Sequence, residues 1–127
     1  MVEQPVCPCG GGPYAECCEP LHAGSMEAST AEALMRSRYS AFALGLSDYL
    51  WRTWHPRTRP ERVLLDGTDW LGLEIVEVVD GTERGLTGIV EFVARFREGR
   101  RAGSMHERSR FERRGPRWMY VDGDHGR

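Results

Sequence analysis

Hydrophobic residues in the first half of the chain recur with the period of an α-helix. Four of them are spaced by three or four residues and form one apolar stripe: Met35, Tyr39, Phe42 and Leu46. This spacing is typical of a helix that buries one face. Ser29, with Glu32 three residues later, forms a capping-box pattern, and Gly45 is a typical C-terminal signal. The sequence therefore predicts a helix from about Ser29 to Gly45.

Two shorter helices are expected after the first. Residues 47–54 are rich in aromatic and aliphatic side chains and precede His55-Pro56, a pair that disfavours a further helical turn. Pro60 is a typical first residue of a helix, so a helix of one or two turns is predicted from there to Leu65.

From Trp70 onward, hydrophobic positions alternate with polar ones, as they do in strands with one buried face. The clearest alternating set is Val90, Phe92, Ala94 and Phe96. An earlier set on the same pattern is Leu71, Leu73 and Ile75. Residues 105–113 and 118–121 also have the composition of strands, and turns that contain Gly or Pro separate the four segments. Helices followed by an antiparallel meander predict an α+β domain.

The segment before the first helix has no such pattern and holds every cysteine of the chain: Cys7, Cys9, Cys17 and Cys18. Four thiolates within twelve residues can converge on one tetrahedral metal ion. Zinc is the first choice for such a site, and iron is also accepted. The segment has few large apolar side chains, so metal binding would supply its folding energy. Four cysteine ligands describe a closed structural site, in which His22 could replace one cysteine.

The four cysteines could also form disulfides or remain free thiols, and the expected cellular compartment helps to decide between these alternatives and a metal site. The N-terminus lacks a signal-peptide pattern, and no apolar run approaches the roughly 18 residues that a membrane span needs. A cytoplasmic location without membrane association is therefore expected. Disulfides are rare in the cytoplasm, and a bridge between Cys17 and Cys18 would be strained. A metal site is the favoured interpretation.

The charge is small overall but unevenly placed. A net charge of −2 argues against a protein that binds nucleic acid with its whole surface. From Arg95 to the end, however, there are 10 arginines and 5 acidic residues. This part of the chain can attract an acidic partner or ligand locally.

The motif Cys7-Pro8-Cys9-Gly10, followed by Cys17-Cys18, resembles the SEC-C motif, although its spacer is one residue shorter than usual. Residues 34–39, 53–56, 70–73, 92–96, 107–111 and 118–123 resemble, in order, segments of the YchJ family of bacterial proteins. The resemblance implies a metal-binding knuckle at residues 1–24. It also implies a second domain at residues 25–127, similar to nuclear transport factor two and ketosteroid isomerase. In that fold, N-terminal helices pack on a curved antiparallel sheet that forms a cone.

Domains of this fold usually have a cavity between the helices and the sheet, and four residues are candidates to line it: Arg38, Tyr39, Trp54 and His55. Arg38 could clamp an anion or pair with Glu107. His55 could act as a general base or cap the C-terminus of a helix. Trp54 is expected in the core or the cavity wall rather than as a stacking platform.

The residues leave the function open, because no known catalytic motif is present and the chain is not expected to be an enzyme. The favoured hypothesis is a zinc-binding interaction protein whose four-cysteine knuckle recruits a macromolecular partner, most simply a protein. One alternative is a small-molecule-binding protein or enzyme that uses the cavity. Another is single-stranded nucleic-acid or ribosome binding through the knuckle and a basic strand face at His106, Arg108 and Arg110. A homodimer through the open face of the sheet is also possible.

Overall fold

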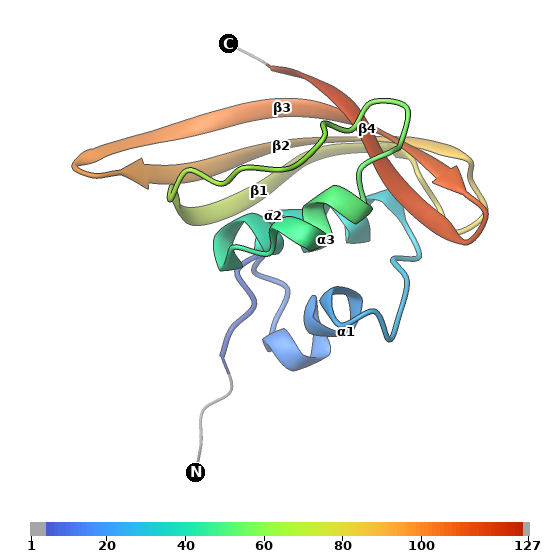
Figure 1. Cartoon of the computed structure of the whole chain (residues 1–127), viewed down its shortest axis with the longest axis horizontal. Helices are drawn as coiled ribbons and strands as arrows, with labels where there is room; N and C mark the ends of the chain where they lie inside the picture. Colours follow the sequence, from blue (N-terminus) through green and yellow to red (C-terminus); the bar gives the residue numbers. More distant parts are fainter. Residues whose placement is uncertain (1–4, 126–127) are drawn as a thin grey trace.

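Four antiparallel strands form a meander in the order β1-β2-β3-β4, and the helices precede them in the chain (Figure 1). The computed structural model describes residues 5–125; residues 1–4 and 126–127 of the two predicted domains lie outside the described residues. The helical elements are the 3-10 turn η1 (Tyr14–Glu16), α1 (Glu19–His22), α2 (Ala31–Leu44) and α3 (Ser47–Arg52). The strands are β1 (Asp69–Asp80), β2 (Thr87–Glu98), β3 (Arg101–Arg114) and β4 (Arg117–His125).

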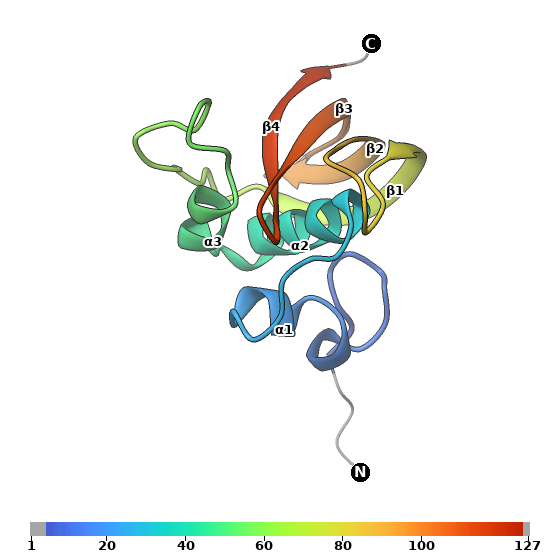
Figure 2. The ribbon, with the colours of Figure 1, turned by 90° about the vertical axis from the view of Figure 1, so that its right-hand side faces the viewer.

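The molecule has three layers, which Figures 1 and 2 show from two sides. The curved sheet forms one layer, and α2 and α3 lie along its concave side. The knuckle, whose described part is residues 5–24, lies on the side of α2 that faces away from the sheet. Helix α2 is therefore the middle layer, and the expected architecture of helices on a curved antiparallel sheet is confirmed.

The main helix has nearly the predicted ends. Gly45 follows the last helical residue with φ of 77°, a left-handed conformation that glycine adopts without a Cβ penalty. At the other end the N-cap is Thr30, not Ser29, because the Thr30 hydroxyl accepts a hydrogen bond from the Ala33 amide at 3.0 Å. Glu32 is then too early for a capping box and pairs with Arg36 instead.

One predicted helix is absent. Helix α3 begins at Ser47 as expected, but residues 60–65 have no helical structure. A short helix in water needs an apolar face that packs on something, and Leu64 is 79% exposed. With little to bury, this segment stays irregular.

Strand β1 departs from simple alternation because its register with β2 shifts between Trp70 and Gly72 and again between Ile75 and Glu77. Such irregularities change the face on which the following side chains lie. Leu71, predicted on the same face as Leu73 and Ile75, is consequently 54% exposed, whereas Trp70 packs against the core.

The core lies between α2 and the inner face of the sheet. Strand β2 contributes the predicted Val90, Phe92 and Ala94, and strand β3 contributes Phe111. Each large side chain buried there stabilises the fold by about 1.5–3 kcal/mol. The same cluster includes three cysteines of the knuckle, so the three layers share one core. None of the helices within residues 5–125 is long and apolar enough to cross a membrane.

Two glycines let the start of α2 approach the sheet closely. A Cβ on Gly88 would lie 2.5 Å from the Cα of Gly81 and 3.0 Å from the Cβ of Ala31. The carbonyl of Gly81 accepts a hydrogen bond from the Ala31 amide at 3.0 Å. Backbone contact at this point therefore fixes where α2 begins relative to β1 and β2.

Gly88→Ala is expected to lower the free energy of unfolding by about 1–3 kcal/mol, because the new methyl group overlaps backbone atoms that cannot move independently. Gly85→Ala is the matched control, since a Cβ there meets its nearest atom at 3.4 Å. Urea unfolding of both variants measures the difference. Equal stability of the two variants would contradict this account of the contact.

Candidate metal centre and adjoining cavity

The sulfur atoms of the knuckle converge. All four predicted cysteines place Sγ within 4.8 Å of one another, and all four thiols are free. Three of the separations are 3.4 Å (Cys9–Cys17), 3.7 Å (Cys9–Cys18) and 3.9 Å (Cys17–Cys18). A tetrahedral ion with metal–sulfur bonds of about 2.3 Å sets its ligands about 3.8 Å apart. The cluster therefore fits a metal ion, and the short spacer does not prevent convergence.

Two glycines in the spacer between Cys9 and Cys17 allow the sulfur atoms to converge, each for a different reason. Gly10 has φ of 85°, a left-handed conformation that suits the tight turn after Cys9, and its N–H donates to the Cys7 carbonyl at 2.9 Å. The backbone of Gly11 lies beside the Cys9 sulfur and helps to lower the pKa of that thiol. A Cβ on Gly11 would lie 2.8 Å from Cys17 Sγ, so only glycine fits between the sulfurs.

The charge of the thiols is unequally distributed. The hydrogen bond from Cys18 lowers the pKa of Cys9, and the same contact raises the pKa of Cys18. Burial raises the pKa of Cys17. Ionisation of all four thiols at these separations would bring like charges together, and a cation among them offsets that repulsion.

Helix α2 completes the surroundings of the cluster. The Ser40 hydroxyl lies 3.3 Å from both Cys7 Sγ and Cys18 Sγ. Arg36 Nη1 donates to the Cys9 carbonyl at 3.0 Å. Ser40 is 0% exposed, although the helical pattern places it opposite the apolar stripe. The knuckle covers this face, and the sequence pattern of α2 gives no sign of it.

His22 does not join the cluster. Its Nε2 donates to the Ser37 carbonyl at 2.8 Å, so Nδ1 accepts from the Tyr14 hydroxyl at 2.6 Å. Burial lowers the pKa of His22, which favours this neutral form. Both ring nitrogens are thereby engaged in fixing the knuckle to α2, and His22 offers none to a metal.

A cavity of about 330 Å³ lies on the other side of α2, between the helix and the sheet. Its walls are largely apolar and include Met35, Tyr39, Phe42, Trp54, Trp70, Phe92, Ala94, Met105 and Phe111. The polar residues in its lining are Arg38, Glu107, Ser109, Tyr120 and His125. A concave apolar volume with a few polar groups is typical of small-molecule sites.

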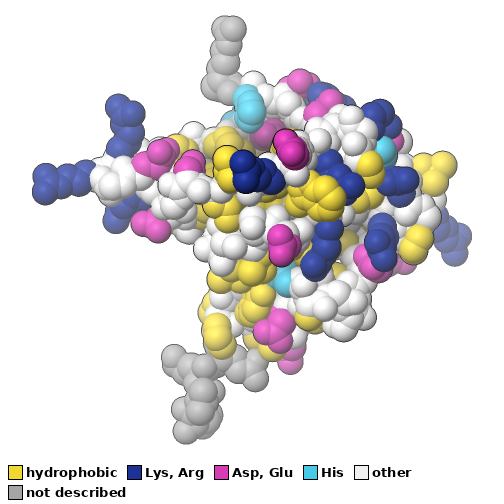
Figure 3. All heavy atoms as spheres, viewed as in Figure 1, with side chains coloured by type: hydrophobic (Ala, Val, Ile, Leu, Met, Phe, Trp, Pro, Cys, Tyr) yellow, Lys and Arg dark blue, Asp and Glu magenta, His cyan; other side chains and the backbone are white. Residues whose placement is uncertain are grey.

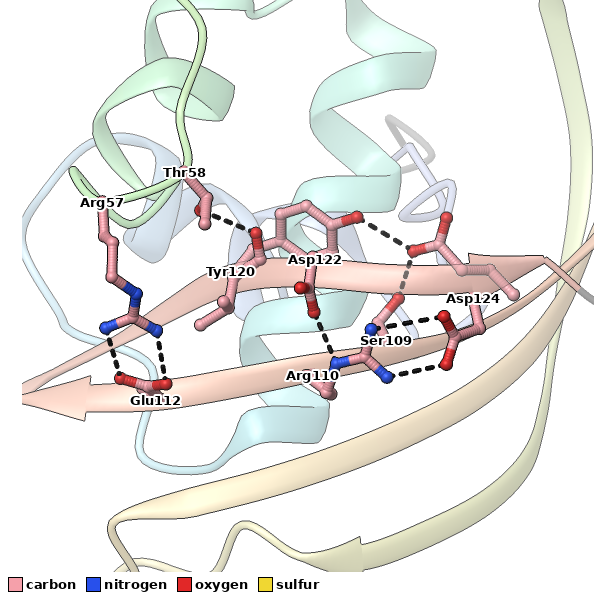
Figure 4. Close-up of polar contacts among 10 residues, drawn as sticks. Arg57, Thr58, Ser109, Arg110, Glu112, Tyr120, Asp122 and Asp124 are labelled. Atoms are coloured by element: carbon pink, nitrogen blue, oxygen red, sulfur yellow. Dashed lines mark hydrogen bonds and ion pairs between the residues drawn. The ribbon is translucent and has the colours of Figure 1, made fainter.

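The carboxylate in the cavity has its own hydrogen-bond donors. Glu107 Oε2 accepts from the hydroxyls of Ser109 and, at 3.2 Å, Tyr120. Ser109 is on the same strand as Glu107, β3, and Tyr120 is on the neighbouring strand β4 (Figure 4). The Nε2 of His125 lies 2.9 Å from Glu107 Oε1. Burial raises the pKa of the Tyr120 hydroxyl, so Tyr120 stays a donor at neutral pH.

Arg38 brings a positive charge into the same cavity. Its Nη1 donates to the Leu50 carbonyl at 2.8 Å and to the Thr53 hydroxyl at 2.7 Å. The guanidinium lies 4.6 Å from the ring centre of Tyr120 and 5.4 Å from that of Trp54. Burial lowers the pKa of Arg38 to about 10, which leaves it protonated at neutral pH.

Comparisons with known proteins agree with this architecture. The family model for the middle, NTF2-like domain of YchJ matches residues 30–123. A UPF0225 protein of Chromobacterium violaceum is 55% identical over 92% of this chain and 90% of its own length. A UPF0225 protein of Streptomyces coelicolor is 54% identical over 94% of this chain and 95% of its own length.

Two solved structures of SEC-C motif proteins also resemble this chain. The solution structure of a SEC-C motif containing protein from Rhodopseudomonas palustris superposes with a TM-score of 0.81 at 38% identity, covering 97% of this chain and all of the other. The crystal structure of a SEC-C motif containing protein from Psychrobacter arcticus superposes with a TM-score of 0.73 at 32% identity. The match covers 92% of this chain and 80% of the other chain. The chain belongs to the YchJ (UPF0225) family.

In this YchJ-family chain, three of the four predicted pocket residues line the cavity: Arg38, Tyr39 and Trp54. His55 does not. Its backbone amide donates to the Tyr120 carbonyl, and its Nδ1 accepts from the Arg57 amide at 3.0 Å. Since α3 ends at Arg52, His55 shapes the following turn instead of capping the helix.

The expected pair between Arg38 and Glu107 is also absent among the described residues. Ser109, Tyr120 and His125 surround the Glu107 oxygens, while Arg38 bonds to the end of α3. Sequence reasoning did not assign Ser109, Tyr120 and His125 to the cavity. One signal was available, because Glu107 and Ser109 are polar residues at alternate positions on the inner, otherwise apolar face of β3.

The basic strand face has partners of its own. His106 contacts Glu91, and Arg108 contacts both Glu91 and Glu77. Arg110 reaches Asp122 and Asp124 on β4 (Figure 4). Arg57, on the turn after α3, pairs with Glu112 in the same view. Most of the positive charge on this face is therefore matched within the sheet.

Ser40→Ala is expected to weaken metal binding roughly 10- to 100-fold, because it removes the hydroxyl that contacts two sulfurs. Competition with a chromogenic chelator, using Zn²⁺ and Fe²⁺ in turn, measures the affinity. Ser104→Ala, at an exposed position on β3, is the control. Unchanged affinity in Ser40→Ala would show that the contact does not support the ligands.

Proposed function

We propose that this YchJ-family chain is a small-molecule-binding protein whose zinc site fixes the helix over its cavity. The observation that carries the proposal is the cavity itself, which combines about 330 Å³ of largely apolar space with a buried guanidinium and a buried carboxylate. Binding without catalysis is the simplest role, because the oxygens of Glu107 already accept hydrogen bonds from protein donors.

Zinc is the proposed metal, with iron as the variant. The donor set is four thiolates, which a d¹⁰ ion in tetrahedral geometry accepts without a further ligand. Three of the cysteines are buried, so the site is closed to substrates. The proposed role of the ion is therefore structural.

The zinc site and the cavity are connected through α2. The Ser37 carbonyl and the Ser40 hydroxyl contact the knuckle, whereas Arg38 and Tyr39, which lie between them in the sequence, line the cavity. A shift of α2 on one side moves side chains on the other. Loss of the ion is therefore expected to make α2, which carries Arg38 and forms one wall of the cavity, less rigid.

A role in recruiting a macromolecular partner, through the knuckle or another surface, is the second candidate. It is favoured by exposed apolar side chains on β1, namely Leu71, Val76 and Val78. Apolar residues on an open sheet face are typical of a protein–protein interface, and the partner could be another protein or a second copy of this chain. Nucleic-acid binding has less support, because the strand face is charge-paired. Figure 3 shows basic side chains at the tip of the β2–β3 hairpin, where Arg100 and Arg101 are exposed.

Elemental mass spectrometry of untagged protein is expected to find one zinc per chain. Cys7→Ser is expected to lose it and to unfold at a lower temperature, because ion binding stabilises the folded state. Met26→Ser, at an exposed site near the knuckle, is the control. A wild-type chain without stoichiometric metal would overturn the proposed zinc site.

Ala94→Leu is expected to weaken the binding of neutral apolar molecules about ten-fold or more, because it places three extra carbons inside the cavity. Cinnamamide is a suitable probe, followed by NMR shifts of the tryptophan indole N–H groups, since Trp54 and Trp70 line the cavity. Ala102→Leu, on the exposed surface of β3, is the control. Equal binding to both variants would place the ligand elsewhere.

A further inference from the structure

Arg38 is buried with part of its hydrogen-bonding capacity unused. The residue is 5% exposed, and both of its hydrogen bonds to residues 5–125 come from Nη1. The N–H groups on Nε and Nη2 have no partner in that part of the chain, and the residue lines the cavity. A guanidinium presents five donors in a planar fork, which suits a compact group with two oxygens.

The charge of Arg38 also lacks a close counter-ion among the described residues. Glu107 is the carboxylate that lines the same cavity, but Ser109, Tyr120 and His125 surround its oxygens. The guanidinium instead faces the rings of Tyr120 and Trp54. A buried cation without a paired anion destabilises the folded state, and an anionic ligand would offset that cost.

Trp54 supplies a second unused donor. Its Nε1 is buried and has no hydrogen-bond partner within residues 5–125, the one such side-chain atom found there. Buried donors in native proteins are nearly always paired, and the Trp54 side chain is part of the cavity lining, so a ligand in the cavity could supply the missing acceptor. The Trp54 ring lies beside the Arg38 guanidinium, which places the two donors in the same part of the cavity.

The rest of the cavity lining and the cavity volume limit the chemistry and the size of the ligand. Phe42, Trp70 and Phe92 come from α2, β1 and β2 and contribute aromatic rings to the cavity wall. The volume of about 330 Å³ equals that of about ten water molecules, which limits the ligand to a small molecule. The Arg38 guanidinium carries one positive charge without a close counter-ion among the described residues, so a ligand with one negative charge would balance it.

From these observations we infer that the cavity binds a small apolar monocarboxylate, whose carboxylate accepts from Arg38 and Trp54 Nε1 while its hydrocarbon part packs on the aromatic walls. This inference rests on the proposed ligand-binding function and names the class of ligand.

The test compares carboxylates with their uncharged amides on the zinc-loaded, full-length chain. Benzoate, hexanoate and cinnamate are each paired with the corresponding amide, and affinities are measured by calorimetry at neutral pH. At least one carboxylate is expected to bind about ten-fold or more tightly than its amide, since a charge-assisted bond to arginine exceeds a neutral one. The Trp54 indole N–H resonance is expected to shift when that carboxylate binds.

The outcomes separate the two levels of the proposal. Equal affinity of carboxylates and amides would overturn the inference about charge and leave the ligand-binding function standing. Binding of neither class would overturn both. This comparison uses the unmodified chain, so it does not depend on whether a variant folds.

Two variants then assign the donors. Arg38→Met is expected to abolish the preference for the carboxylate, and Trp54→Phe to lower carboxylate affinity several-fold while keeping an aromatic ring. Arg84→Met, at an exposed position, is the control. A preference for carboxylate that survives in folded Arg38→Met protein would overturn the assignment of Arg38.

Discussion

Helix α2 is buried on both of its long faces, and the positions of the metal centre and of the cavity depend on this. On one side Ser40 contacts two sulfurs of the knuckle, and on the other Arg38 and Tyr39 line the cavity. A helix held from both sides has little freedom to slide or rotate, because cores are close-packed. The small Ser37 and Ser40 side chains let the knuckle approach the helix, while larger residues would hold it away.

A metal ion held by the four cysteines would therefore stabilise more than the knuckle itself. The cysteines of the knuckle belong to the same apolar cluster as Leu34 and Phe111, so the free energy of metal binding would also stabilise the contact of this layer with α2. His22 adds a second attachment through the Ser37 carbonyl. Under the proposed function, metal binding would couple the order of the N-terminal segment to the shape of the cavity on the far side of the helix.

The cavity illustrates a cost that a packed core avoids. Arg38 and Glu107 are both buried, yet they bond to different neighbours and leave donors of Arg38 and Trp54 unused. The buried Trp54 Nε1, which has no acceptor within residues 5–125, destabilises the fold by about 1–3 kcal/mol. Filling the volume with aliphatic side chains would remove that cost, so polar groups retained in an open cavity are more consistent with binding than with stability alone.

The sequence by itself determined the main helix, the strands and the cysteine cluster, because periodicity and capping act over a few residues, but it did not determine the short segment 60–65. The 3.6-residue repeat at Met35, Tyr39 and Phe42 predicted α2, the two-residue repeat at Val90, Phe92 and Ala94 predicted β2, and the cysteine spacing predicted the cluster. Register shifts in β1, which expose Leu71, leave no mark in a pattern of hydrophobic positions. The burial of Ser40 and the grouping of Arg38 with Trp54 and Tyr120 depend on contacts between residues far apart in the chain. The position of His55 outside the cavity lining depends on such contacts as well. Only the packing of three layers decides such contacts, since each requires the other layers to be in place.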